Sequence, residues 1–237
     1  MKINFPDQIL FEDDDFLVAN KLPFLSTLED RGSNQNLQAL AKSYHPELSA
    51  CHRLDKETSG CVLFAKHDEA YRSASIQFEK RKVIKEYHAF VDGIHEFDNL
   101  VVDLPILPLS KGSVIIDAKK GKPSKTSFTT LELYKKHSLV ACYPESGRMH
   151  QIRIHLAQKE APIINDALYG GKDLFLSEIK KKYRLSKDAE EQPLIKRFAL
   201  HAHALTFTKM NGEKQKVEAA YPKDLRVLKK QLDANRF

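Results

Sequence analysis

The fold of this chain is constrained most by a succession of short apolar segments separated by turn sequences. Residues 9–21, ILFEDDDFLVANK, are predicted to form two short strands around an acidic turn, and residues 83–93, VIKEYHAFVDG, a further strand. A strand over 126–134 follows, and a hairpin is predicted around Asn211-Gly212, a strong two-residue turn. Segments of this length favour antiparallel strands joined by tight connections.

Another hairpin is predicted from residues 138–143, SLVACY, and 148–156, RMHQIRIHL, which flank the turn sequence PESG. In the second segment apolar and polar residues alternate, so one side should face the core and the other solvent or a cleft. The polar side consists of Gln151, Arg153 and His155. These groups suit contacts to phosphates or base edges, and Arg153 could instead hold a carboxylate. For a single strand, an ordinary solvated sheet face is the simpler interpretation.

Helical spacing appears over residues 36–45, over 67–82 and in the tail after residue 220. The expected apolar stripes consist of Tyr71, Ser75, Phe78 and Lys82 on 67–82, and of Leu225, Leu228 and Leu232 on the tail. Many hairpins with few helices predict an α+β fold, built on a mixed, largely antiparallel β-sheet flanked by helices. No break in composition divides the chain, so a single domain over residues 1–237 is expected.

The charge balance favours a polyanionic partner, with 38 lysine and arginine residues against 32 acidic ones and a pI near 9.0. Solubility alone explains this excess almost as well. No stretch approaches the roughly 18 apolar residues of a membrane helix, and the acidic start lacks the layout of a signal peptide. We therefore expect a cytoplasmic protein without a membrane partner. Cys51, Cys61 and Cys142 lack CxxC spacing and are expected to be reduced, mostly buried thiols.

The segment CHRLDKETSG, residues 51–60, concentrates several reactive side chains. Leu54 is predicted to anchor it in the core, so Arg53 and Asp55 should project to the opposite side. A carboxylate beside guanidinium groups suits a nucleophile or a fixed base. Thr58-Ser59-Gly60 is expected to turn the chain into the strand CVLFAK. An ion-paired surface loop accounts for these residues at least as well.

Other chemistries find less support in the sequence. The spacing of the histidines does not match a metal-binding motif, and no acidic residue or cysteine completes a ligand set. The histidines concerned are His150, His155, His201 and His203. Residues 121–127, GKPSKTS, lack the first glycine of a phosphate-binding loop, and a strand pattern follows where a helix is required. A basic loop that contacts RNA and a plain solvated loop are the two interpretations.

Several segments together resemble the RNA pseudouridine synthases of the RluA type, from about residue 9 to about 220. HRLDKETSG is similar to the family's catalytic-loop signature, KEYHAFVDG to the segment with its active-site tyrosine, and SGRMHQIRIHLA to its GRxHQIRxHL strand. ALYGG and RFALHAHALTF are similar to later segments. The resemblance implies the pseudouridine synthase fold, with an active-site cleft across the sheet.

The resemblance also implies roles for individual residues. Asp55 corresponds to the essential aspartate, Tyr87 to a tyrosine that stacks on the target base, and Arg153 to the basic residue that pairs with the aspartate. Arg53 corresponds to an arginine that touches RNA near the flipped nucleotide. With the basic loop, the expected RNA-binding residues are Arg53, His52, Arg148, Gln151, Lys122 and Lys125. No metal and no organic cofactor are expected.

The implied reaction converts specific uridines of structured RNA, in ribosomal RNA, transfer RNA or both, to pseudouridine after base flipping. A monomer is expected, with no protein partner and no amino-terminal accessory RNA-binding domain. Two departures concern substrate contacts: NKLPFLS stands where the family often has NKPxG, and Asn165 precedes Asp166 where it often has glycine. The rival functions are an RNA-binding module without catalysis and, more remotely, a metal hydrolase that uses the histidines.

Overall fold

The structure is a computed structural model that describes residues 3–29, 35–110, 112–181, 183–184 and 189–236. The chain divides into two compact units, each with an apolar core of its own. The first unit comprises Met1–Glu86 and His201–Ala220, and the second comprises Tyr87–Leu200 and Tyr221–Phe237. Among the described residues, no helix has both the length and the apolar character needed to cross a membrane.

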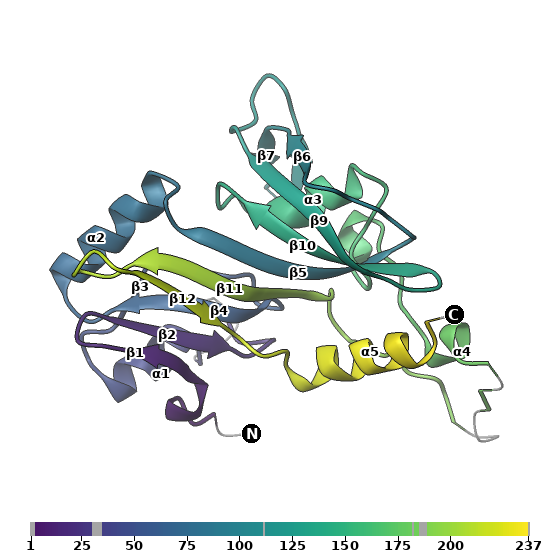
Figure 1. Ribbon diagram of the computed structural model, residues 1–237, viewed down its shortest axis with the longest axis horizontal. Coiled ribbons are helices and arrows are strands. Elements are labelled where there is room, and N and C mark those ends of the chain that lie inside the picture. The colour runs from purple at the N-terminus through teal and green to yellow at the C-terminus, as the bar shows by residue number, and fades with distance from the viewer. Residues whose placement is uncertain (1–2, 30–34, 111, 182, 185–188, 237) are drawn as a thin grey trace. The chain divides into compact units, whose positions relative to one another are not determined.

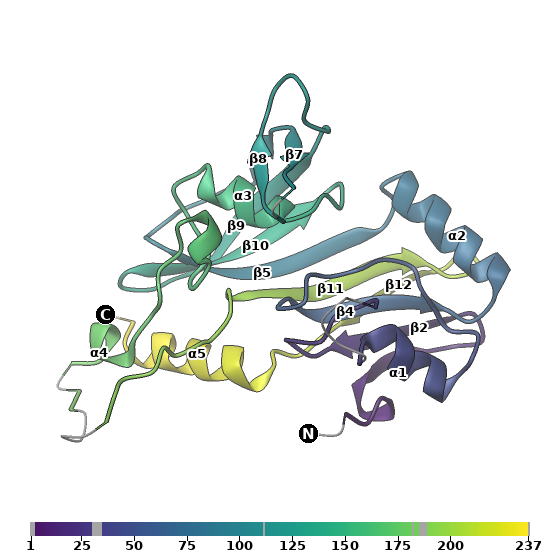
Figure 2. The same ribbon diagram turned by 180° about the vertical axis from the view of Figure 1, so that it is seen from behind.

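The first unit is built on a mixed sheet (Figure 1). Its strands, in hydrogen-bonded order, are β1 (Ile9–Glu12), β2 (Phe16–Lys21), β4 (Ser59–Ala65), β11 (Leu200–Thr208) and β12 (Lys214–Glu218), and the short β3 (Ser49–Ala50) also pairs with β4. β4 and β11 are parallel, and the other pairs are antiparallel. The helical elements are η1 (Pro6–Gln8), α1 (Leu37–Tyr44) and α2 (Asp68–Glu79). Helix α1 covers the face of this sheet that is turned to the viewer in Figure 2.

The close approach of β4 and β11 depends on a glycine. Gly60 lies opposite Ala202 in the parallel pair and has a left-handed backbone, with φ of 114°. A Cβ atom at this position would lie 2.1 Å from the carbonyl oxygen of Ala202. Only glycine satisfies both constraints, so Gly60 fixes where the segment before β4 meets the sheet.

The second unit is built on an antiparallel sheet of β5 (Ile84–Asp92), β10 (His137–Pro144), β9 (Lys125–Leu133) and β6 (Leu100–Asp103), in that order. Strand β5 enters this unit at Tyr87. A separate hairpin consists of β7 (Ile106–Pro108) and β8 (Val114–Ile116). The helical elements are α3 (Gln151–Ala157), η2 (Ala167–Tyr169), α4 (Leu176–Ile179) and α5 (Lys223–Ala234).

Most of the predicted elements are confirmed. The acidic turn joins β1 to β2, and the Asp13 carboxylate accepts hydrogen bonds from the amides of Asp15 and Phe16. The Asn211-Gly212 turn joins β11 to β12. The tail helix buries its leucine stripe, which consists of Leu225, Leu228 and Leu232. The α+β fold class, with a mostly antiparallel sheet, is therefore confirmed, as are the free cysteines.

The strand predicted over 148–156 is wrong, because residues 151–157 form helix α3. The hairpin partner of β10 is β9 instead. His150 has a left-handed backbone with φ of 53°, which turns the chain into the helix. Both sets of alternating side chains are buried, since the polar ones are hydrogen-bonded inside the unit.

The helix predicted over 67–82 is confirmed as α2, but its predicted stripe is right only at Phe78, which is partly buried against the core of the first unit. The side chains that α2 buries are those of Ala70, Ala74 and Gln77. Tyr71 is 42% exposed. The alanines pack closely against β4 because they are small, and Gln77 is buried because its amide bonds the main chain of Thr208 in both directions.

Candidate active site

Asp55 lies on the segment between β3 and β4, which we call the aspartate loop (residues 51–58). The loop begins beside β4, because the Cys51 amide donates to the Leu63 carbonyl, and it ends in a turn in which the Thr58 amide donates to the Asp55 carbonyl. Leu54 is 5% exposed, which confirms it as the anchor. Arg53 is exposed and Asp55 half-buried. The carboxylate thus follows a fixed apolar residue, and neither it nor Arg53 is withdrawn into the core.

A hydroxyl group fixes the main chain just before the aspartate. The Thr27 Oγ1 donates to the Leu54 carbonyl oxygen over 3.1 Å and accepts from the Leu54 amide over 3.0 Å. Thr27 is almost fully buried. One side chain therefore holds both polar groups of the residue that precedes Asp55.

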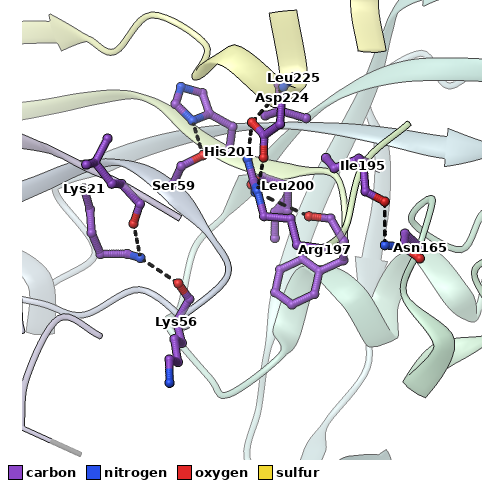
Figure 3. A network of polar contacts seen from close by, with 12 residues as sticks. Lys21, Lys56, Ser59, Asn165, Ile195, Arg197, Leu200, His201, Asp224 and Leu225 are labelled. Carbon is purple, nitrogen blue, oxygen red and sulfur yellow. Dashed lines mark hydrogen bonds and ion pairs between the residues drawn. The ribbon is translucent and has the colours of Figure 1, made fainter. Parts of the chain in front are cut away.

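A buried lysine fixes the main chain just after the aspartate. The Lys21 side chain is fully buried at the end of β2, and its ammonium group donates to the Lys56 carbonyl oxygen over 3.0 Å (Figure 3). The same group donates to the carbonyls of Leu25, at 2.7 Å, and Leu22, at 3.1 Å. Asp55 therefore lies between two residues whose positions are set by β2 and the loop that follows it.

His52 attaches the start of the aspartate loop to β4. Its Nε2 accepts a hydrogen bond from the Leu63 amide over 3.1 Å, and its ring lies 5.0 Å from that of Phe78. Burial, with the nearby charge of Lys85, lowers the pKa of His52 to about 3. A neutral imidazole is consistent with the acceptor role, so these contacts give His52 a structural task.

His201 fixes the beginning of β4. Its Nε2 lies 3.0 Å from the Ala219 carbonyl oxygen and must donate to it, because a carbonyl can only accept. In a neutral ring the Nδ1, 2.9 Å from the Ser59 hydroxyl, then accepts from that hydroxyl (Figure 3). Both ring nitrogens of His201 are used, which disfavours it as a metal ligand.

Arg153, on α3 of the second unit, forms a buried bidentate pair with Asp166. The Nε and one terminal nitrogen donate to the two carboxylate oxygens over 2.7 and 2.6 Å, and neither side chain is more than 7% exposed. The guanidinium also lies 4.1 Å from the centre of the Phe198 ring and 5.0 Å from that of Tyr169. These contacts fix its plane in a manner that a lysine could not reproduce.

Arg197 and Asn165 hold further main-chain segments of the second unit. Arg197 is fully buried and donates from Nε to the Asp224 carboxylate over 2.7 Å and from a terminal nitrogen to the Leu200 carbonyl over 3.0 Å (Figure 3). Asn165, with φ of 63°, donates from its amide to the Ile195 carbonyl. The asparagine that replaces the family's usual glycine therefore keeps a left-handed backbone and adds a tether.

Tyr87 is the first residue of the second unit and lies on β5 opposite Cys142 of β10. It is half-buried and packs against the apolar core of this unit. A tyrosine on a central strand has a fixed backbone position, so its ring is held by the sheet rather than by a loop. Its expected stacking on the target base stays a prediction.

Gln151 is 4% exposed, and its amide is fully engaged within the protein. Its nitrogen donates to the Lys125 carbonyl and the Thr126 hydroxyl, and its oxygen accepts from the Ser146 hydroxyl and the Arg148 amide. An amide side chain offers two donor hydrogens and two acceptor lone pairs, and all four are used. Gln151 therefore positions the loop that carries Arg148.

The basic candidates of the second unit lie at the surface. Arg148 and Lys122 are exposed, and Lys125 pairs with Glu145 over 2.9 Å. His155, in contrast, is buried between the Thr126 hydroxyl and the Leu104 carbonyl, which occupy both of its ring nitrogens. The metal-hydrolase alternative is therefore disfavoured for His155 as for His201.

The first unit brings Asp55, Arg53 and His52 together on one loop, and the second unit holds Tyr87, Arg153 and the other candidates. The expected pair between Asp55 and Arg153 stays a prediction. Sequence reasoning missed the three residues that fix these groups, which are Lys21, Thr27 and Asp166. The available signal for Lys21 was its position at the end of an apolar strand. No sequence pattern pointed to Thr27.

The comparisons with known proteins identify the family of this chain. Residues 6–158 match the family model described as RNA pseudouridylate synthase. Ribosomal large subunit pseudouridine synthase C of Buchnera aphidicola is 36% identical over 215 residues, which are 87% of this chain and 64% of that protein. The chain thus spans less than two thirds of that relative. An uncharacterised RNA pseudouridine synthase of Zymomonas mobilis is 34% identical, with 91% of this chain and 94% of that protein covered.

A solved structure gives the same result. Human RNA Pseudouridylate Synthase Domain Containing 1 matches with a TM-score of 0.69 and 27% identity, over 91% of this chain and 83% of that one. The fold and the family match define an RNA-modifying class of protein. The chain belongs to the RNA pseudouridylate synthase family.

Proposed function

We propose that this protein is an RNA pseudouridine synthase that converts specific uridines of structured RNA to pseudouridine, with Asp55 as its catalytic residue. The observation that carries the proposal is the aspartate loop itself. In a chain of this family, Asp55 lies between Leu54 and Lys56, whose main-chain groups are held by Thr27 and Lys21. Such rigid support is what a preorganised catalytic group requires.

The reaction is an isomerisation and consumes no co-substrate, and we propose that it proceeds without a cofactor. The bond between N1 of uracil and C1′ of the ribose breaks, the ring rotates, and a bond from C5 to C1′ forms. The proton on C5 is lost and N1 gains one, so atoms and electrons balance. Asp55 supplies the anionic group that this exchange requires beside the sugar or the ring. We propose that Arg153 orients that group and that Tyr87 stacks on the flipped base.

We further propose that the two units act together as a single catalytic domain in a monomer, without a protein partner. Flipping a uridine out of a stem costs a few kcal/mol, which contacts to the RNA backbone offset. Arg53, Arg148 and Lys122, which are exposed, are the proposed contacts to the RNA backbone, together with the partly exposed Lys125. His52 and Gln151 support them by holding their loops in place.

The proposed substrate is ribosomal RNA of the large subunit, with transfer RNA as the alternative, and the proposed compartment is the cytoplasm. Several relatives at about one-third identity are named ribosomal large subunit pseudouridine synthase C, for example the protein of Escherichia coli, 35% identical over 93% of this chain and 68% of that one. Those names concern the relatives, and the experiment below decides between the two RNAs.

The test is to incubate the purified chain separately with large-subunit ribosomal RNA transcripts and with transfer RNA transcripts, and to map pseudouridines by mass spectrometry. We expect conversion at one or a few defined positions of the ribosomal RNA. Tight RNA binding without any pseudouridine, together with no adduct or rearranged product on RNA that contains 5-fluorouridine, would instead identify an RNA-binding module.

A further inference from the structure

Phe24 is an aromatic residue in an unusual setting. Its side chain is 52% exposed, and its backbone has φ of 63°. A left-handed backbone is disfavoured for bulky side chains. An apolar side chain that stays exposed also contributes little hydrophobic stabilisation to offset this cost. Phe24 also stands at the position of the glycine in the NKPxG pattern, a residue that would adopt this backbone without strain.

The main chain on both sides of Phe24 is fixed. The Lys21 ammonium group bonds the carbonyl oxygens of Leu22 and Leu25, and the Leu25 side chain is 6% exposed. Two hydrogen bonds from the buried Lys21 therefore hold the main chain before and after the strained residue. The benzyl side chain leaves this turn while the rest of the turn is held against the unit.

This turn lies beside the aspartate loop. Lys21 pairs with Gly60 across the antiparallel strands β2 and β4, so the segment after β2 and the segment before β4 leave the sheet at the same end. The Lys21 ammonium group joins the two directly, since it also bonds the Lys56 carbonyl. The exposed Arg53 on the aspartate loop gives this end of the unit a positive group suited to phosphates.

We propose that Phe24 is an RNA-stacking residue of this chain, which packs its ring on an unpaired base next to the target uridine. The inference rests on the proposed function. A rigidly held phenyl ring offers stacking area to any base without the entropy cost of ordering a mobile loop. RNA is favoured over a protein partner as the occupant because the turn that carries Phe24 lies beside the aspartate loop and its exposed arginine.

The test compares Phe24→Gly, Phe24→Trp and the unmodified protein in RNA affinity, KM, kcat and thermal midpoint. Because stacking is lost while backbone strain is relieved, Phe24→Gly should raise the Kd and KM for a target hairpin about tenfold. Its kcat should stay within about twofold, and its thermal midpoint should be unchanged or higher. Phe24→Trp should restore the affinity. Tyr71→Ala is the matched control, since this exposed aromatic follows the opposite end of β4 and should leave the affinity unchanged.

Three outcomes would overturn the inference. Unchanged Kd and KM in Phe24→Gly would show that the ring does not contact RNA. A lower thermal midpoint with unchanged KM would assign Phe24 to packing. Loss of self-association with unchanged RNA affinity would assign it to an interface between copies of the chain. Since Kd is measured without turnover, these outcomes can be read even if the unmodified protein binds RNA and makes no pseudouridine.

Discussion

The ammonium group of Lys21 lies 3.0 Å from the carbonyl oxygen of Lys56, the residue directly after Asp55. A fully buried lysine is rare, and this one is stabilised because three main-chain carbonyls accept its hydrogen bonds. The contact joins the end of β2 to the aspartate loop. It makes the geometry of the proposed catalytic carboxylate depend on a residue that lies 34 positions earlier in the sequence.

We expect Lys21→Met to destabilise the protein by about 2–3 kcal/mol, because it leaves buried carbonyl groups without their charged donor. We also expect kcat to fall at least about tenfold, since a loosely held aspartate loop misplaces the reacting group. Urea unfolding and single-turnover kinetics measure the two effects. Lys56→Ala is the control for stability, because it keeps the carbonyl group and removes only an exposed side chain. Equal stability of Lys21→Met and the unmodified protein would contradict the role of the contact.

Asp166→Asn should destabilise the protein by about 3–5 kcal/mol, because it removes the negative charge of the carboxylate that forms a buried bidentate pair with the Arg153 guanidinium. Asp224→Asn is the matched control at a second buried arginine. There the cost should be smaller, about 1–2 kcal/mol, since Arg197 keeps the Leu200 carbonyl as an acceptor. Urea unfolding of the two variants side by side measures the difference. Equal losses of unfolding free energy in the two variants would contradict the claim that the Arg153–Asp166 pair depends more on its charge than the Arg197–Asp224 pair does.

We expect the protein to lose stability at acidic pH because of His52, which lies at the start of the aspartate loop. The pKa of His52 is lowered to about 3 by burial, against about 6.5 in an unfolded chain. The unfolded state therefore takes up a proton below pH 6.5 while the folded state does not. The contribution of His52 to the unfolding free energy is therefore largest above pH 6.5, and it declines as the pH falls from 6.5 toward 3.

His52→Gln isolates this effect, since glutamine keeps an acceptor for the Leu63 amide and cannot be protonated in this range. Between pH 7.5 and pH 5.0 the unmodified protein should lose about 1–2 kcal/mol more of its unfolding free energy than the variant loses. Urea titrations at the two pH values give both slopes. If the variant and the unmodified protein respond equally to pH, His52 is not the titrating group.

The sequence predicted the hairpins and the tail helix well, because turn dipeptides and apolar periodicity are local signals. It failed at residues 151–157, where strict alternation suggested a strand. Alternation distinguishes a strand only if one face is solvated. In α3 the Arg153 and His155 side chains are buried with partners of their own, so the pattern does not report which side faces water.

The site was predictable in part for a related reason. Asp55 and Arg53 belong to a contiguous motif, so their proximity follows from the sequence. Lys21 and Thr27 reach the same loop only through the folded sheet, and Asp166 meets Arg153 across 13 positions. Apart from the position of Lys21 at the end of an apolar strand, no local pattern signals these contacts, and they decide how firmly the proposed groups are held.

The most direct test of the central claim is pseudouridine formation by purified Asp55→Asn on an RNA that the unmodified protein converts. Asparagine keeps the size of the side chain and removes its charge. We expect the rate to fall by at least about a thousandfold, with the thermal midpoint and the RNA Kd close to those of the unmodified protein. Pseudouridine formation by Asp55→Asn at a rate near that of the unmodified protein would contradict the assignment of Asp55 as the catalytic group.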